Sequence, residues 1–212
     1  MSNWEKLISQ GLSALGIPLS QSKVDALGTL LSQLVRWNRV HNLTALKEPE
    51  EIVEVEILDS LAPLLFPEIG FKRASTFADV GCGAGFPLLP LVIATEGVVG
   101  VGIDSSQKRL AFLSHAARVV GVSNRVRVIH ARAEEVDERF PLVMARALAE
   151  PERALELVGS LAGEGGKILL FLSVKDALNV QSRFGGRVLR YCLPFSGKGR
   201  ELWYTVADFA RV

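Results

Sequence analysis

The sequence predicts an α/β fold, in which a doubly wound, Rossmann-like sheet of seven mostly parallel strands follows an N-terminal helical extension. From Ser75 onward, short β-rich runs alternate with helical stretches, which is the pattern of βαβ units. Before that residue, the apolar positions repeat at helical spacing instead. The last two β-rich runs are joined by a segment too short for a crossover helix, so they should pair as an antiparallel hairpin.

The helical extension covers residues 1–73 and should contain three helices. The first is a short amphipathic helix over Trp4–Leu15. The second begins after Ser20 and carries leucine and valine at helical period. The third should run from Pro49 to Leu61, because proline suits the first helical position and the two glutamates after it suit the positive end of the helix dipole.

Residues 74–212 should form the sheet domain. The expected strands are Thr76–Val80, Val98–Ile103, Arg125–His130, Leu142–Arg146, Lys167–Leu172, Val188–Leu193 and Trp203–Phe209. The expected helices are Pro87–Ala94, Gln107–Val120, Pro151–Leu161 and Lys175–Phe184. No internal repeat, linker or low-complexity tract divides this region.

Composition places the chain among ordinary globular proteins. Of its 212 residues, 49% are hydrophobic and 22% are charged, which argues against a disordered or fibrous chain. The formal net charge is +1, so a nucleic-acid partner would have to be bound by a local basic patch. The longest apolar runs, such as Leu88–Thr95, are too short to span a bilayer, and the N-terminus does not resemble a signal peptide.

The two cysteines point to a reducing compartment. Cys82 and Cys192 are far apart, with no C-x-x-C pair and no histidine at metal-ligand spacing. We therefore expect neither a disulfide nor a metal site, no membrane association, and a cytoplasmic location. Cys82 has no basic residue arranged beside it, so we expect it to do no chemistry.

A glycine-rich turn joins the first expected strand to the helix after it, with the sequence Asp79-Val-Gly81-Cys-Gly83-Ala-Gly85-Phe86-Pro87. Glycines let the backbone turn sharply and let a ligand approach the start of the helix. A dinucleotide fingerprint, G-x-G-x-x-G, would need its third glycine at Phe86. The observed D-x-G-x-G-x-G instead resembles the first motif of S-adenosylmethionine-dependent methyltransferases, in which Asp79 can face the ammonium group of the ligand.

Two further markers follow at the ends of the next two strands. Asp104 lies roughly 20 residues past the glycines, where an acid commonly accepts hydrogen bonds from ribose hydroxyls. Ala133 and Glu134 follow the third strand, where a backbone amide and an acidic side chain could bind adenine. Each feature alone also fits a tight corner or, for Asp104, a helix N-cap. Together, at adjacent strand ends, they favour a cofactor site.

Several blocks outside the glycine turn carry a closer resemblance. They are Trp37-Asn38-Arg39-Val-His-Asn42-Leu43-Thr44, Ile57-Leu58-Asp59-Ser60-Leu61, Asp79–Pro90, Ile103-Asp104-Ser105 with Lys108-Arg109, and Arg146-Ala147. In these blocks the chain resembles the glucose-inhibited division protein B family, bacterial methyltransferases that act on N7 of a guanine in small-subunit ribosomal RNA. The first two blocks are specific, because a generic methyltransferase has no reason to carry them ahead of its first strand.

The resemblance implies S-adenosylmethionine as cofactor and small-subunit (16S) ribosomal RNA or a ribosomal particle as partner. We also expect a monomer, and no metal. Carried over by position, the resemblance implies cofactor contacts at Gly81, Phe86, Ala133, Glu134 and Arg146. Ser105, which follows Asp104, is a further candidate for cofactor binding. The resemblance implies catalytic roles for Arg146, near the cofactor or the guanine, and for Arg200, which matches an arginine in the closing G-x-R segment. Guanine N7 carries a free lone pair, so no general base is required and alignment and electrostatics would supply the rate.

Three departures from the family pattern concern the substrate side. Leu88 stands where glycine is usual, Val55-Glu56 replaces Arg-His, and Leu172-Ser173 replaces Lys-Gly. We expect these positions to face the RNA or the catalytic mouth. They leave open two alternatives, a small-molecule methyltransferase and a non-catalytic RNA- or ribosome-binding protein of the same fold. Candidates for phosphate contacts are Arg36, Arg39, Lys47, Arg187, Arg190, Lys198 and Arg200.

Overall fold

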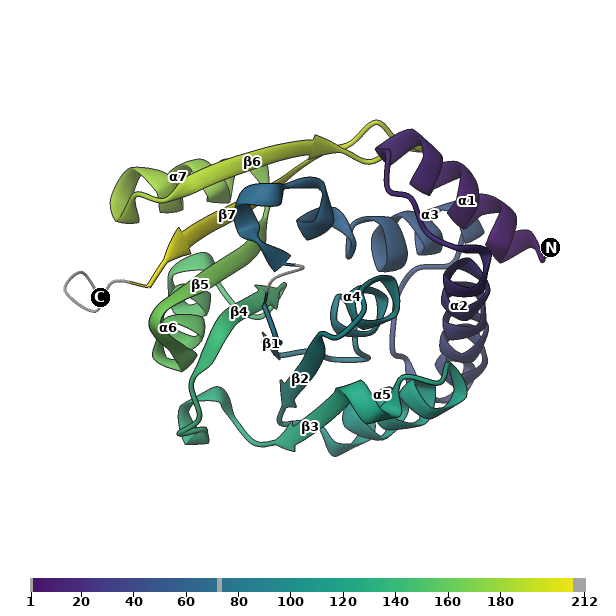
Figure 1. The fold of residues 1–212 in the computed structure, drawn as a ribbon, viewed down its shortest axis with the longest axis horizontal. Helices are drawn as coiled ribbons and strands as arrows, with labels where there is room; N and C mark the ends of the chain where they lie inside the picture. Colours follow the sequence, from purple (N-terminus) through teal and green to yellow (C-terminus); the bar gives the residue numbers. More distant parts are fainter. Residues whose placement is uncertain (1, 72–73, 208–212) are drawn as a thin grey trace.

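A single twisted sheet forms the centre of the molecule in the computed structural model, which describes residues 2–71 and 74–207 (Figure 1). Its order is β3-β2-β1-β4-β5-β7-β6. The strands are β1 (Thr76–Val80), β2 (Val99–Asp104), β3 (Val126–His130), β4 (Phe140–Arg146), β5 (Ala162–Leu172), β6 (Arg187–Cys192) and β7 (Gly199–Val206). Only β7 runs antiparallel to its neighbours, β5 and β6. The predicted doubly wound sheet with a closing hairpin is therefore confirmed.

Helices cover both faces of this sheet (Figure 1). They are α1 (Asn3–Leu15), α2 (Gln21–His41), α3 (Pro49–Ile52), α4 (Leu88–Ala94), α5 (Gln107–Val119), α6 (Pro151–Leu161) and α7 (Val174–Phe184). The N-terminal helices pack with α4 and α5 in one hydrophobic cluster, whereas α6 and α7 pack in a second cluster on the other face. No helix of the described residues is long and apolar enough to cross a bilayer.

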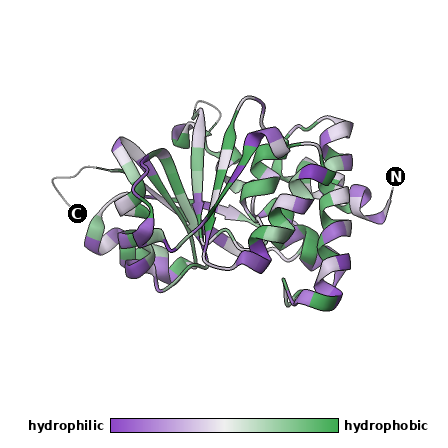
Figure 2. Cartoon of the chain, turned by 90° about the horizontal axis from the view of Figure 1, so that it is seen from below, coloured by the Kyte–Doolittle hydropathy of each residue, from purple (hydrophilic) through white to green (hydrophobic). Residues whose placement is uncertain are grey.

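The sheet carries two apolar faces because its strands alternate with a period of two. In β4, Leu142 and Met144 belong to the cluster of α4 and α5, while Val143 and Ala145 belong to that of α6 and α7. A sheet buried on both sides needs nearly continuous apolar strands, which the hydropathy colouring shows at the centre of the molecule (Figure 2). This layering exposes the carboxyl ends of β1, β2 and β4 at one edge, where open α/β sheets bind ligands.

The third predicted helix differs from the expectation. Only Pro49–Ile52 is α-helical, and the chain continues as a π-helical turn over Val53–Leu58, closed by the Asp59 N–H donating to the Glu54 carbonyl at 2.9 Å. A shorter 3-10 segment, Ala62–Leu65, follows. The π-helical turn is wider than an α-turn, and it buries acidic side chains together with apolar ones. Such turns are rare and often occur at functional sites.

Contacts at the end of α2 show the structural role of several residues in the Trp37–Thr44 block. The Asn38 side chain donates to the carbonyl of Thr44 and accepts from its N–H, both at 2.9 Å. Asn42 takes a left-handed conformation (φ 49°) that ends the helix. The Trp37 ring lies against Phe112 of α5. These contacts fix the segment that leads to the π-helical turn.

Two expectations concern residues that the structure does not describe, 72–73 and 208–212. The last strand was expected to reach Phe209, but β7 ends at Val206, and residues 208–212 lie outside the described residues. The proposed boundary between residues 73 and 74 adjoins residues 72–73, which also lie outside them. β5 begins at Ala162, earlier than expected, and its pairing with β4 is irregular between Phe140 and Leu142.

Candidate active site

The glycine-rich turn lies at the carboxyl end of β1. Gly81 has φ 68°, a conformation that side chains other than glycine rarely adopt, and a Cβ there would lie 2.4 Å from Cδ1 of Leu148. Gly83 and Gly85 also have positive φ, 53° and 88°. Phe86 is buried as the chain enters α4. The turn therefore folds as the glycine spacing predicts, with backbone open to a ligand at Gly83.

Asp79 is a buried acid beneath this turn. Its side chain is 1% exposed, and neither carboxylate oxygen has a partner that meets hydrogen-bond geometry. Burial raises the pKa of Asp79 from 3.8 to about 7, against the opposing effects of the Arg146 charge and the Leu88 amide. An unpartnered carboxylate in this position fits the ammonium group of a bound cofactor, which would compensate the cost of its burial.

Asp104 joins the glycine turn to the start of α5. Its Oδ2 accepts from the N–H of Gly83 at 2.9 Å, and its Oδ1 accepts from the N–H of Ser106 at 2.7 Å. Ser106, not Asp104, caps α5, because its hydroxyl accepts from the Arg109 N–H. Each carboxylate oxygen of Asp104 keeps a second lone pair that could accept from a ribose hydroxyl. Ser105, which lies between Asp104 and Ser106 in the chain, is exposed.

The third predicted marker forms a 3-10 turn over Ala133–Glu135, directly after β3. Ala133 is buried, and the exposed Glu134 carboxylate pairs with Arg153 of α6. Glu134 thus has an ionic partner before any ligand is considered. Ser105 and this turn follow adjacent strands, β2 and β3, so the fold places the second and third markers side by side.

No metal-binding group of three or more His, Cys, Asp or Glu side chains occurs among the described residues. Both cysteines are free. Cys82 is buried within the glycine turn, and burial together with the charges of Asp79 and Asp104 raises the pKa of its thiol. The thiol is therefore protonated near neutral pH and a poor nucleophile, in line with the prediction that Cys82 does no chemistry.

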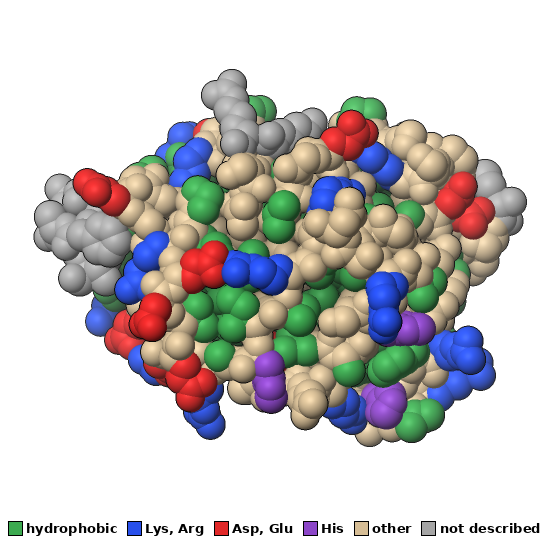
Figure 3. Space-filling view, turned by 60° about the horizontal axis from the view of Figure 1, so that its bottom comes forward, with side chains coloured by type: hydrophobic (Ala, Val, Ile, Leu, Met, Phe, Trp, Pro, Cys, Tyr) green, Lys and Arg blue, Asp and Glu red, His purple; other side chains and the backbone are tan. Residues whose placement is uncertain are grey.

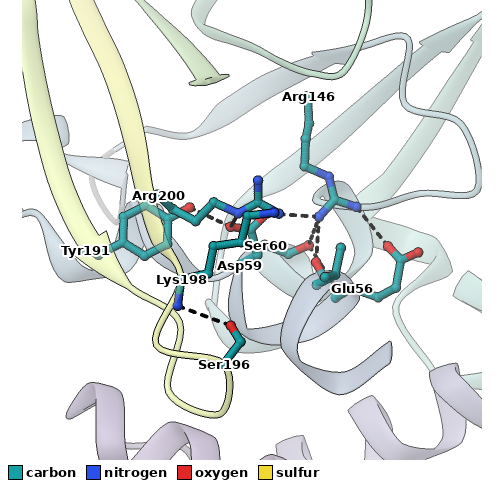
Figure 4. Close-up of polar contacts among 9 residues, drawn as sticks. Glu56, Asp59, Ser60, Arg146, Tyr191, Ser196, Lys198 and Arg200 are labelled. Atoms are coloured by element: carbon teal, nitrogen blue, oxygen red, sulfur yellow. Dashed lines mark hydrogen bonds and ion pairs between the residues drawn. The ribbon is translucent and has the colours of Figure 1, made fainter. Parts of the chain in front are cut away.

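Arg146 leaves the end of β4 and enters a network of polar side chains (Figure 4). One terminal nitrogen, Nη1, donates to the carbonyl of Val55 at 2.6 Å and lies 3.4 Å from Oδ2 of Asp59 and 3.5 Å from Oγ of Ser60. The other, Nη2, donates to Oε2 of Glu56 at 2.8 Å. The guanidinium is thus held by the π-helical turn and the residues that follow it.

Asp59 connects this network to the C-terminal hairpin (Figure 4). The hydroxyl of Tyr191, on β6, donates to Asp59 Oδ1 at 2.7 Å, and burial and the Asp59 charge raise the pKa of Tyr191. Nε of Arg200, on β7, lies 3.6 Å from the same oxygen. One buried carboxylate therefore faces two arginines and a phenol from three different strands.

A second buried acid of the π-helical turn holds the hairpin loop. Oε1 of Glu54 accepts from the N–H groups of Phe195 and Ser196, at 2.6 and 2.9 Å. Glu54 is 4% exposed, so these bonds are shielded from water. The loop between β6 and β7 is therefore attached to the N-terminal part of the chain.

The sequence profile of the family described as rRNA small subunit methyltransferase G matches residues 23–183. The chain belongs to this family. It is 36% identical to the ribosomal RNA small subunit methyltransferase G of Myxococcus xanthus, over 99% of this chain and 98% of that protein, and 40% identical to that of Aquifex aeolicus, over 69% and 75%. The solved magnesium protoporphyrin IX methyltransferase of Synechocystis, which contains bound S-adenosylmethionine, has the same fold, with a TM-score of 0.56, 14% identity and coverage of 90% and 99%.

The departures from the family pattern do not all lie where we expected. Leu88 is fully buried, and it packs against β2 at Gly100 and Gly102, where added Cβ atoms would meet its side chain at 3.1 and 3.2 Å. The expectation that Leu88 faces the RNA or the catalytic mouth is therefore wrong, because the two glycines make room for it in the core. Glu56 is also buried and pairs with Arg146. Ser173 caps α7.

Sequence reasoning missed most residues that surround Asp59 and hold the hairpin. Glu54 and Tyr191 were not singled out, and Glu56, the partner of Arg146, was noted only as a departure. No local spacing connects Asp59 to Tyr191, which are 132 residues apart. The one available signal was the resemblance in the Ile57–Leu61 block, which marked Asp59 without showing its partners.

Proposed function

We propose that this protein transfers the methyl group of S-adenosylmethionine to N7 of a guanine in small-subunit (16S) ribosomal RNA. The observation that carries the proposal is the glycine turn with Asp79 and Asp104, at the ligand-binding edge of a chain that belongs to the rRNA small subunit methyltransferase G family. Family membership favours RNA over a small-molecule substrate. The intact turn favours an enzyme over a non-catalytic binding protein.

The cofactor would be held by residues of four strand ends. We assign to it Asp79, Gly81, Gly83, Gly85, Phe86, Asp104, Ser105, Ala133, Glu134 and Arg146. When bound, it supplies an electrophilic methyl carbon. Asp79 would pair with its ammonium group, Asp104 would accept from its ribose, and the turn at Ala133 and Glu134 would face its adenine.

The catalytic contribution of the chain would be orientation and charge. Among the described residues, Arg146 donates from Nη1 and Nη2 but makes no protein hydrogen bond from Nε, so its guanidinium keeps donors for the cofactor or the guanine. Arg200 is less exposed than the other hairpin cations, since Asp59 holds it in the network. We propose that Arg146 and Arg200 act there by electrostatics, because N7 needs no deprotonation.

Phosphate contacts would fall to cations without an acidic partner. Arg187 pairs with Glu68, and Arg190 pairs with Glu201. Of the remaining candidates within the described part of the chain, those without an ion pair are Arg36, Arg39, Lys47 and Lys198. The space-filling view shows basic side chains spread over one face and interspersed with acidic ones, more of which lie at the left than at the right (Figure 3). RNA binding would therefore be local and weakened by salt.

N7 methylation can be read directly on the RNA. Ribosomal RNA that lacks the mark would be incubated with enzyme and cofactor, reduced, and treated with aniline, which cuts at N7-methylguanine because its glycosidic bond is weakened. We expect one new cut in the small-subunit RNA, and none with a Gly81→Val protein. Transfer of a labelled methyl group to the RNA without any cut would reject N7, and transfer only to another acceptor would reject the RNA.

The raised pKa of Asp79 predicts a pH-dependent affinity for S-adenosylmethionine. Below about pH 7 the carboxyl is protonated in the free protein and must ionise to pair with an ammonium group. Affinity should therefore rise as the pH increases toward about 7, by up to about tenfold per unit, with release of a proton. Stability should change in the opposite direction: the contribution of Asp79 is fully present below its unfolded pKa of 3.8 and is lost as the pH rises through about 7.

Titration calorimetry in two buffers of different ionisation enthalpy measures this proton release. The Asp79→Asn protein, which cannot ionise, should bind without it. If the affinity of the wild-type protein for S-adenosylmethionine stays constant between about pH 5.5 and 7.5, Asp79 does not bind the cofactor.

Asp104→Ala should weaken S-adenosylmethionine binding by about 1.5–3 kcal/mol, the range for a lost hydrogen bond to a charged group. The change also frees the N–H of Gly83, which Asp104 holds in place. Ser106→Ala is the matched control, because it removes the N-cap of α5 but leaves the carboxylate. Calorimetry should show near wild-type affinity for the control, and equal affinities for both variants would contradict the assignment.

We also propose that residues 1–73 form the helical extension and residues 74–212 the cofactor-binding domain. The enzyme would act as a monomer in the cytoplasm. These proposals rest on the sequence and, for the location, on the ribosomal RNA named for the relatives.

A further inference from the structure

A small cavity opens beside the glycine turn, between the end of β4 and the start of α7. Its volume is about 180 Å³. Leu148 lines it and also lies against Gly81, so the cavity adjoins the proposed cofactor site through a single side chain. Pockets for drug-sized ligands are usually roughly 300–1,000 Å³, so this one suits a single planar group and not a longer ligand.

The lining of the cavity combines small apolar residues with acids. Phe171, at the end of β5, borders it, but its ring packs in the cluster of α4 and α5 on the other face of the sheet. Glu150 and Asp176 are the ionisable residues of the lining. No lysine, arginine or histidine of the described residues lines it. A phosphate would be repelled here. A neutral planar group that donates hydrogen bonds would be complementary.

Asp176 is held in a fixed position at this cavity. The Ser173 hydroxyl donates to Asp176 Oδ2 at 2.6 Å, and the Asp176 N–H donates back to the same hydroxyl at 3.2 Å. Among the described residues, Oδ1 of Asp176 has no hydrogen-bond partner. One carboxylate oxygen is thus oriented by Ser173, and the other is available to a ligand.

We propose that this cavity takes the Watson–Crick edge of the guanine that is methylated, with Asp176 accepting from its N1–H and N2–H₂ groups. This proposal rests on the proposed function. Guanine is the base that presents two adjacent donors on that edge, so a carboxylate distinguishes it from the others. N7 lies on the five-membered ring, away from N1 and N2, and stays uncovered for methyl transfer. Enzymes that modify a base commonly bind it out of the stack in this way.

The test compares guanosine with inosine, which lacks the N2 amino group but keeps N7. Small-subunit RNA is prepared with either nucleoside at the position that aniline cleavage identifies. We expect the wild-type protein to methylate the inosine RNA with kcat/KM lowered by about tenfold or more, because a carboxylate loses one donor. Asp176→Asn should lower kcat/KM on the guanosine RNA and abolish most of this discrimination, with S-adenosylmethionine affinity unchanged.

Asp25→Asn is the matched control. Asp25 is an exposed helical aspartate that, like Asp176, accepts one side-chain hydrogen bond, from Gln21. It should behave as wild type on both RNAs. The inference is overturned if Asp176→Asn keeps wild-type kcat/KM, or if it loses activity while retaining the full guanosine-to-inosine ratio, as a purely structural helix cap would. Failure of the wild-type protein to methylate any ribosomal RNA would instead overturn the proposed function.

Discussion

Gly81→Val is expected to abolish measurable S-adenosylmethionine binding and to destabilise the protein. A β-branched residue at φ 68° costs about 1–3 kcal/mol of backbone strain. The new side chain would also meet Leu148, whose Cδ1 lies 2.4 Å from the ideal Cβ position, and overpacking of this kind costs about a further 1–3 kcal/mol. Relief of the contact would displace the turn itself. No ligand-competent conformation of the turn then remains.

Gly97→Val separates strain from site chemistry. Gly97 has φ 72°, but its Cβ would have no neighbour within 4 Å, and it lies on the loop before β2. Urea unfolding should show the strain cost in both variants, and calorimetry should show loss of cofactor binding only in Gly81→Val. Leu148→Ala, combined with Gly81→Val, should recover stability without recovering binding. If the Gly81→Val protein binds S-adenosylmethionine with wild-type affinity, the turn only connects β1 to α4 and has no role in cofactor binding.

Asp59→Ala should have the second large effect, because it removes the one carboxylate shared by Arg146, Tyr191 and Arg200. Removing one partner of a buried ion pair typically costs about 3–5 kcal/mol, since the remaining charge is left uncompensated. Asp59 itself is 5% exposed in its side chain, and its two arginines are 16% and 26% exposed, so water can compensate them only in part. Methyl transfer should fall with the loss of the fixed Arg146 orientation.

Tyr191→Phe gives the graded comparison. It removes one hydrogen bond to Asp59 and should cost about 1.5–3 kcal/mol, with Arg146 still held by Glu56. A double-mutant cycle between Asp59→Ala and Tyr191→Phe, measured by urea unfolding, should yield a coupling of about 0.5–3 kcal/mol. Additive effects would show that the phenol and the carboxylate do not act together.

Most of the sheet could be predicted because its signals are local. β1 was predicted as Thr76–Val80 because an apolar run ends at glycine, and α6 was predicted as Pro151–Leu161 because proline marks the first turn. The cofactor markers share this property, since strand ends fix where Asp79 and Asp104 lie. Each of these interpretations needs only a few neighbouring residues.

The rest depends on contacts that no short window contains. Leu88 was expected at the catalytic mouth, and only the two glycines of β2 show why it is buried. The π-helical turn replaces an α-helix where Glu54, Glu56 and Asp59 bind residues of β4 and the hairpin. The periodicity of the sequence does not reveal these partners, because tertiary hydrogen bonds, and not local helix propensity, determine the π-helical conformation of this turn.

The attachment of the hairpin loop to Glu54 has a consequence for biosynthesis. Glu54 and its amide partners are 141 and 142 residues apart, so one half of the contact is synthesised long before the other. Contacts of such long range form late, after the cost of closing the intervening chain has been met. Nascent chains that stop between Tyr191 and Phe195 therefore carry the glycine turn and Tyr191 but lack Arg200 and the amides that bind Glu54. The arginine network can be completed only after Arg200 has been synthesised, and termination before it yields products in which that network is incomplete.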